Sequence, residues 1–291
     1  MKINLLYFFP LFLLVACNPS QPTQNQDAAI DVDSVEEQVV PPLPLPAVGM
    51  FVGEFLAVDY DENKDISYSN KITMAIETLE NGVVKGYSIV AGNSRPFEGT
   101  YAEKNGALSV TAREPGDDKY DGAFTFQMHR DSQNVSGSWE AFNRKLGVTK
   151  RTFNLEKRVF QYDPNLEMPK DGITGLDLYN TFRESEDDPG SAEFLTEDAT
   201  KFNASKTLLR KEDVENMHKG DLEVIRNAIY ARHGYSFKNR RMRYLFDRNV
   251  DWYMPVSTNV SQQFTALERK NIDLLKRYEQ HAASYYDSFG R

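Results

Sequence analysis

Apolar and polar side chains alternate with a period of two between residues 50 and 160. Phe124, Phe126 and Met128, for example, are separated by Thr125 and Gln127. Because successive side chains of a β-strand point to opposite faces, this pattern predicts strands with one buried and one wet face. Eight stretches are expected to form strands: 50–59, 71–77, 83–90, 97–103, 108–112, 124–128, 135–141 and 153–155.

Turn signals separate these stretches and leave no room for a helix between them. Asn81-Gly82 and Asn105-Gly106 are typical of tight β-hairpins. Short connections favour antiparallel neighbours along the chain. Residues 50–160 are therefore predicted to form a small antiparallel β-barrel or sandwich, a meander similar in plan to that of the lipocalins.

An eight-stranded barrel either fills itself with side chains or holds one small ligand. Six aromatic residues are candidates for either role, and we favour the filled core: Phe51, Phe55, Phe97, Phe124, Phe126 and Trp139. Near a glycine-rich turn, Arg95 and Glu98 are expected to form an ion pair at the rim rather than to contact a ligand.

From residue 205 the hydrophobic period changes to that of a helix. Leu222, Ile225 and Ile229 form one apolar stripe, with Asp221 as the expected N-cap and Gly234 as the C′ glycine. Further helices are expected at 207–217, 240–247 and 264–278. The fold class predicted for the whole chain is α+β multidomain: the β domain at 50–160, an acidic connector at 161–204, a helical domain at 205–280 and a tail at 281–291.

Residues 225–237 read IRNAIYARHGYSF, and Trp252-Tyr253 and Glu268-x-x-Asn271 follow. This segment resembles the YARHG domain, a family named after the motif at Tyr230–Gly234. The resemblance implies a small extracytoplasmic domain of exported bacterial proteins. It implies no catalytic residue and no ligand.

Arg226, Tyr230 and His233 lie on one stripe of the expected helix, flanked by Arg232. The stripe is a candidate binding site for an anion or a sugar. It is also a candidate structural network in which Arg226 or Arg232 pairs with Glu268, and we favour this reading because buried polar groups need partners. The spacing of the histidines predicts no metal site.

A basic run begins just after the motif and consists of Lys238, Arg240, Arg241, Arg243 and Arg248. Two interpretations are equally favoured. The run contacts an anionic polymer such as peptidoglycan, or lipid headgroups. Alternatively, it pairs with the connector, since residues 161–200 carry eleven acidic and two basic residues, whereas 201–291 carry seventeen basic and eleven acidic ones.

The N-terminus has the pattern of an export signal. Residues 3–15 are almost wholly apolar, yet the run is shorter than the roughly 20 residues of a membrane-spanning helix. Leu14-Val15-Ala16-Cys17 resembles a lipobox, which predicts a signal peptide at 1–16, cleavage between Ala16 and Cys17, and lipid on Cys17. Residues 17–49 are rich in Pro and Gln and are expected to form a spacer.

The formal net charge of −9 argues against binding nucleic acid through the overall field. The sequence predicts no cofactor and no assembled catalytic set. We therefore expect a lipid-anchored binding or scaffold protein of the cell envelope, at the outer membrane. Two alternatives are a carrier of a small ligand in the barrel, and a wall hydrolase that would use Glu98, Glu140 and His233.

Overall fold

The computed structural model of the chain describes residues 47–131, 133–178 and 194–285. These residues all belong to one compact unit. The predicted signal peptide, Cys17 and most of the spacer lie outside the described ranges. Within these ranges, no helix combines the length and the apolar character needed to cross a membrane.

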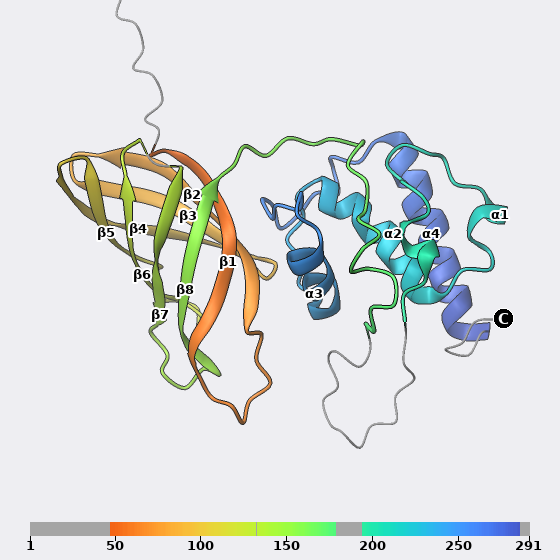
Figure 1. Ribbon diagram of the computed structural model, residues 1–291, viewed down its shortest axis with the longest axis horizontal. Coiled ribbons are helices and arrows are strands. Elements are labelled where there is room, and N and C mark those ends of the chain that lie inside the picture. The colour runs from red at the N-terminus through yellow and green to blue at the C-terminus, as the bar shows by residue number, and fades with distance from the viewer. Residues whose placement is uncertain (1–46, 132, 179–193, 286–291) are drawn as a thin grey trace, which may run out of the picture. The chain divides into compact units, whose positions relative to one another are not determined.

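Eight strands form a closed barrel in which every strand pairs antiparallel with the next along the chain and β8 pairs with β1 (Figure 1). The strands are β1 Gly49–Tyr60, β2 Ser69–Glu80, β3 Val83–Val90, β4 Asn93–Lys104, β5 Ala107–Arg113, β6 Gly122–His129, β7 Asn134–Ala141 and β8 Val148–Lys157. The predicted antiparallel fold is confirmed, and it is a barrel rather than a sandwich.

Two-residue turns close three of the hairpins. Asn81-Gly82 and Asn105-Gly106 have positive φ at both residues, as the tight turn requires. The third turn is Ala91-Gly92, where the sequence favours Gly92-Asn93. The pairing of Val90 with Asn93 places Ala91 at a φ of 50°, so the register of the sheet overrides the local preference of alanine.

The six aromatic residues expected in the barrel interior are all buried and belong to one core cluster. Phe124 packs against Phe97 and Phe153 with ring centroids 5.6 and 6.1 Å apart, and Phe55 packs against Trp139 at 5.9 Å. Packed aromatic side chains therefore fill the middle of the barrel.

The expected ion pair between Arg95 and Glu98 is wrong. Both lie in β4, and residues three apart on a strand point to opposite faces. Arg95 turns inward to Asp121, with Nε 3.1 Å from Oδ1, whereas Glu98 pairs on the outside with Lys85.

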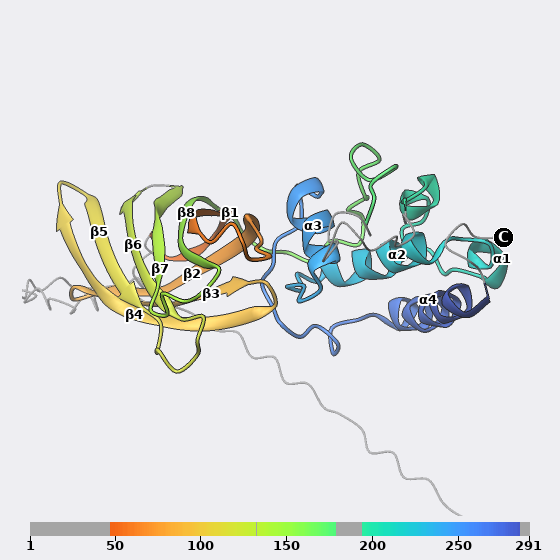
Figure 2. The ribbon, with the colours of Figure 1, turned by 90° about the horizontal axis from the view of Figure 1, so that it is seen from below.

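In the described ranges, the helical part contains a 3₁₀ turn, η2 Glu197–Thr200, and four α-helices. The α-helices are labelled in Figure 2. These are α1 Lys211–Val214, α2 Lys219–Arg232, α3 Arg240–Asn249 and α4 Ala266–Tyr285. Gly234 has a φ of +72° after α2, so the predicted C′ glycine is confirmed.

Asp221 is not the N-cap of α2, because the helix begins two residues earlier at Lys219. The carboxylate of Asp221 instead accepts hydrogen bonds from the backbone N–H and the hydroxyl of Thr196, at 2.9 and 2.7 Å. It thereby holds the segment before η2 against α2.

The helix expected at 207–217 is reduced to the four residues of α1. Asn271 of α4 accepts from the N–H of Leu209 and donates to the carbonyls of Ala204 and Thr207. Since these backbone groups are bound by a side chain, they are not available for helical hydrogen bonds.

Strand β2 is attached to the segment formed by α3 and the residues that follow it. The backbone N–H of Lys71 donates to Asp247 Oδ2 at 2.8 Å. Its Nζ donates to the carbonyls of Val250 and Tyr253 at 3.1 and 3.2 Å. In the β3–β4 turn, the N–H of Gly92 donates to Ser236 Oγ at 2.9 Å. These contacts fix α3 beside the end of the barrel.

Candidate functional site

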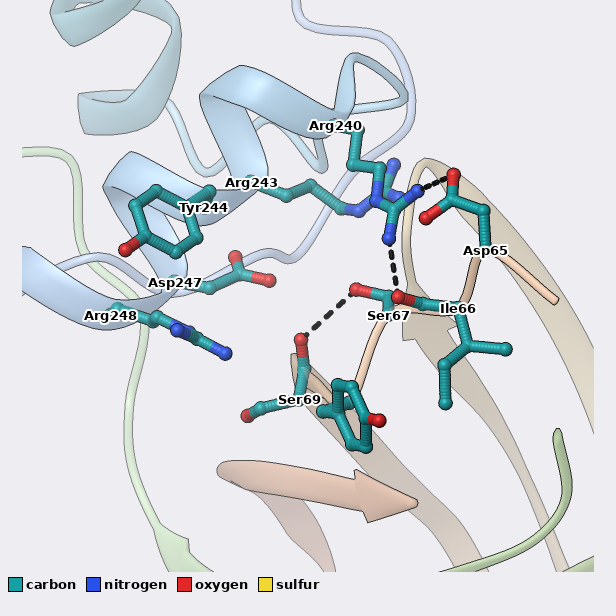
Figure 3. Close-up of a pocket in the computed structure, with 10 residues that line it drawn as sticks. Asp65, Ile66, Ser67, Ser69, Arg240, Arg243, Tyr244, Asp247 and Arg248 are labelled. Atoms are coloured by element: carbon teal, nitrogen blue, oxygen red, sulfur yellow. Dashed lines mark hydrogen bonds and ion pairs between the residues drawn. The ribbon is translucent and has the colours of Figure 1, made fainter. Parts of the chain in front are cut away.

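A pocket of about 380 Å³ lies between α3 and the β1–β2 connection (Figure 3). Its barrel side is formed by residues 65–69 and its helical side by five polar side chains of α3: Arg240, Arg243, Tyr244, Asp247 and Arg248. Figure 3 shows Arg240 and Arg243 reaching from the helix toward Asp65 and Ile66.

The sequence of α3 explains this orientation. Asn239 caps the helix by accepting from the N–H groups of Arg241 and Met242. Met242, Leu245 and Phe246 are buried in the helical core. Arg240, Arg243 and Asp247 follow the 3.6-residue period on another face, which is therefore the face turned to the barrel.

The arginines of this face differ in how far they are neutralised. Arg240 forms an ion pair with Asp65 and donates to the carbonyl of Ile66. Arg243 donates through Nη1 to the carbonyl of Lys238, and its Nε is buried with no acceptor among the described residues. Burial lowers the pKa of Arg243. The Nε of Arg240 is buried without a described acceptor as well, but among the described ion pairs only Arg240 of these two has a carboxylate partner.

A second pocket, of about 560 Å³, continues from the first into the end of the barrel. Both pockets are lined by Arg240 and Arg243. The second pocket adds Arg151, an inward-facing residue of β8 whose side chain is 8% exposed. We call Arg151, Arg240 and Arg243 the arginine cluster.

The described hydrogen bonds of Arg151 all go to backbone carbonyls, and its guanidinium also lies over the ring of Phe55. Its Nη1 donates to Phe55 O at 2.9 Å and its Nη2 to Ser67 O at 2.8 Å. Burial and the neighbouring charge of Arg243 lower the pKa of Arg151 to about 10. Two like charges in a partly dry pocket make the entry of an anion favourable, because the anion relieves their repulsion.

Asp247 lines the first pocket together with Arg240 and Arg243, and its carboxylate partly offsets their positive charge. Burial raises the pKa of Asp247 to about 6, although the N–H and the ammonium of Lys71 oppose that rise. Near neutral pH the carboxylate of Asp247 accepts a hydrogen bond from the N–H of Lys71. The described hydrogen bond of the Arg243 guanidinium goes to the carbonyl of Lys238 instead. The arginine cluster is suited to a carboxylate or phosphate, which arginine binds through two parallel N–H groups.

The other residues of the basic run lie outside this cluster. Arg241 pairs with Glu223 of α2 at 3.0 Å, and Lys238 is exposed. Arg248 is exposed at the rim and lies over the ring of Tyr244. The described ion pairs of the run lead to Asp65 and Glu223, neither of which belongs to the acidic connector.

The side chains of the polar stripe of α2 have partners within the protein. His233, 3% exposed, binds Glu268 Oε2 through Nε2 at 2.9 Å. Glu268 also accepts from the Tyr162 hydroxyl at 3.0 Å and from the N–H of Thr265 at 2.9 Å. Tyr162 stacks on the His233 ring with centroids 4.2 Å apart. His233 and Glu268 thus bind groups of the protein itself, as the structural interpretation expects.

The partner expected for Glu268 is nevertheless wrong: it is His233 and not an arginine. Arg226 pairs with Glu279 instead. Because α2 and α4 run antiparallel, an earlier position on α2 faces a later position on α4. Arg232 donates from Nε to the carbonyl of Leu166 at 2.8 Å.

Tyr230 also serves packing, since its ring contacts Phe264 and Tyr235 edge to face. The three residues suspected of hydrolase chemistry have separate partners. Glu98 pairs with Lys85, Glu140 with Lys150, and His233 with Glu268. In the described ranges, no group of three His, Cys, Asp or Glu side chains is arranged to hold a metal ion.

Sequence reasoning missed Arg151, Asp65 and Asp247. For Arg151 a signal exists, because it precedes Phe153 and Leu155 at an inward position of an alternating strand. A charged residue on the apolar face of a strand indicates a special environment. No sequence pattern brings Asp65 to Arg240.

Residues 199–280 match the family model of the YARHG domain. The match covers α1 to α3 and most of α4, and confirms the resemblance found in the motif. No curated protein sequence matches the chain.

Proposed function

We propose that the protein is a lipid-anchored binding protein of the cell envelope, whose ligand places a carboxylate or phosphate on the arginine cluster. The observation that carries the proposal is the open pocket in which Arg243 keeps a buried Nε–H without a described acceptor, close to the like charge of Arg151. An anionic oxygen would complete this set of donors.

The recessed position of the cluster favours a ligand that enters end-on. Arg240 and Arg241 are already engaged with Asp65 and Glu223, so they offer less to a polymer that lies across the surface. A small molecule, or the exposed end of a larger one, would reach Arg151 and Arg243 inside the pocket. We therefore place the site within the pocket and not on an outer basic face.

We expect Arg243→Gln to weaken binding of inorganic phosphate or acetate at least about tenfold, because a hydrogen bond to a charged group contributes about 1.5–3 kcal/mol. The measurement is a titration of the purified protein followed by the ¹H–¹⁵N signals of arginine Nε–H groups. Lys276→Gln is the matched control, since it removes an exposed positive charge from α4. Equal affinity of Arg243→Gln and wild type would refute the proposed site.

Co-sedimentation with purified wall sacculi across a salt series distinguishes the sources of the anionic group. Salt-sensitive pelleting that is lost in Arg243→Gln would assign the group to the wall polymer. Pelleting that survives in this variant would place wall contacts elsewhere, and a lack of pelleting would leave a free small ligand.

The proposed anchor rests on the apolar run at 3–15 and on Leu14-Val15-Ala16-Cys17. We expect metabolic palmitate labelling of the wild-type protein and none of Cys17→Ala, because the thiol would carry the lipid. Labelling that persists in Cys17→Ala would refute the anchor. The matched control is Asn18→Ala, which leaves the cysteine in place and is expected to label normally.

A further inference from the structure

The pocket inside the barrel has a second charged side chain, Glu114, which is 5% exposed. It follows β5 directly. Its Oε2 accepts from the N–H of Gly122 at 2.7 Å and from Trp139 Nε1 at 3.0 Å. Its Oε1 has a single described contact, a long one of 3.4 Å with Ser88 Oγ, and so has room for a stronger donor.

The surroundings of Glu114 carry an excess of negative charge. Arg95 is the positive charge that acts on Glu114, and it is bound to Asp121 and Asp118 at 3.1 and 3.4 Å. One arginine thus faces three carboxylates. Burial raises the pKa of Glu114, as expected for a carboxyl group that lacks a direct cationic partner.

The acidic group and Arg151 are bound to different parts of the pocket lining. Glu114 is hydrogen-bonded to Gly122 of β6 and Trp139 of β7, whereas Arg151 of β8 is hydrogen-bonded to the carbonyls of Phe55 and Ser67. Trp139 pairs with Arg151 in the register of the sheet. Neither the described hydrogen bonds nor the described ion pairs join Glu114 to Arg151 or Arg243. The acid and the arginines in the pocket therefore have separate partners.

Aromatic side chains form the floor of the pocket. Phe55, Phe124 and Trp139 line the pocket and are almost fully buried. The faces of these rings suit an apolar group, and they also attract a cation that approaches Glu114. The volume of about 560 Å³ falls in the range in which proteins bind small ligands.

We propose that the ligand is a zwitterion with its charges at opposite ends, as in a short peptide: its carboxylate lies on Arg151 and Arg243, its amine donates to Glu114, and an apolar side chain lies on the aromatic floor. The proposal rests on the proposed function, because it adds a second end to the same ligand. Peptides of two to four residues extend at most roughly 7–14 Å, a length suited to the width of such a barrel.

The test uses Ala-Phe, Ala-Phe-Ala and Ala-Phe-Ala-Ala, each with free termini, with an acetylated N-terminus or with an amidated C-terminus. The indole N–H signal of Trp139 is the reporter, because this group donates to Glu114. The chain has two tryptophans, so Trp252→Phe identifies the signal. We expect at least one free peptide to bind, and either modification to weaken it at least about tenfold.

In Glu114→Gln, the side-chain oxygen still accepts from Trp139 and Gly122, but the charge is gone. We expect this variant to bind free and acetylated peptides equally while amidation still weakens binding. The matched control Glu98→Gln removes an exposed acid outside the barrel and is expected to behave as wild type.

The outcomes separate the two proposals. If acetylation has no effect on wild type but amidation does, the amine site is wrong and the anion site stands. If amidation has no effect, the assignment of the carboxylate to the arginine cluster is wrong. If no free peptide of any length shifts the Trp139 signal, the peptide-like ligand is overturned, whereas phosphate or acetate binding still tests the anion site.

Discussion

Glu268→Ala is expected to lower the free energy of unfolding by about 3–5 kcal/mol, the usual cost of removing one partner of a buried ion pair. Glu268 is fully buried and receives hydrogen bonds from His233, Tyr162 and the N–H of Thr265. Truncation would leave three donors without this acceptor in the center of the helical part.

The same carboxylate makes the protein sensitive to acid. Burial would raise the pKa of Glu268, but hydrogen bonds from His233, Thr265 and Ser205 outweigh it and lower the pKa to about 2. A folded-state pKa below the unfolded value of about 4.3 stabilises the fold above that pH, and the stabilisation, on the order of 3 kcal/mol, is lost as the pH falls toward 2.

Urea unfolding between pH 2 and 7 measures both effects. In Glu268→Ala the part of the acid sensitivity that comes from this group should be absent, and the variant should approach wild type at low pH. Glu167→Ala is the matched control, because Glu167 is 61% exposed and pairs only with Lys206 in the described contacts. A loss below about 1 kcal/mol in Glu268→Ala would contradict a structural role for the network.

Phe124→Ala is expected to destabilise the barrel by about 3–5 kcal/mol, as is usual for a buried phenylalanine. The side chain is 1% exposed and packs between Phe97 and Phe153. Because these rings are fixed on β4 and β8, they are poorly placed to close the cavity that the substitution would leave.

Thermal and urea unfolding followed by circular dichroism measure this loss. Phe142→Ala removes the same ring from an exposed position beyond β7, where it lies against Arg113, and should change the free energy of unfolding by less than about 1 kcal/mol. Similar losses in the two variants would mean that the barrel interior tolerates a cavity, and that the filled core contributes less than its burial indicates.

The strands of the barrel were predictable because the patterns that indicate them involve only residues close together along the chain. Alternation in β6, from Phe124 to Met128, and the Asn-Gly turns each need only neighbouring residues. The choice between a barrel and a sandwich was not predictable, since it depends on the pairing of β8 with β1, which are far apart along the chain.

The helical part was predictable where apolar periodicity dominates and not where side chains bind the backbone. The α2 stripe and Gly234 are recognisable in the sequence. The helix expected at 207–217 failed because Asn271, from a distant helix, binds the backbone groups of that segment. The apolar period of a segment depends only on residues close together in the chain, so it does not reveal such a long-range contact.

The candidate site was only half predictable. The basic run identifies Arg243 as a candidate, but its direction depends on how α3 rests on β2 through Lys71 and Asp247. Glu114, directly after β5, and Arg151, in β8, line the same pocket. Their juxtaposition is a product of barrel closure, which the spacing of residues along the chain does not encode.

The pocket draws its walls from both a barrel hairpin and a helix, so it exists only while both are folded. Lys71 is one of the ties between them, since its backbone and its side chain are each bonded to the segment from Asp247 to Tyr253. A bound ligand would therefore act as a thermodynamic link that raises the melting temperature of both parts together. An occupied protein would unfold more cooperatively than an empty one, although its covalent chain is the same.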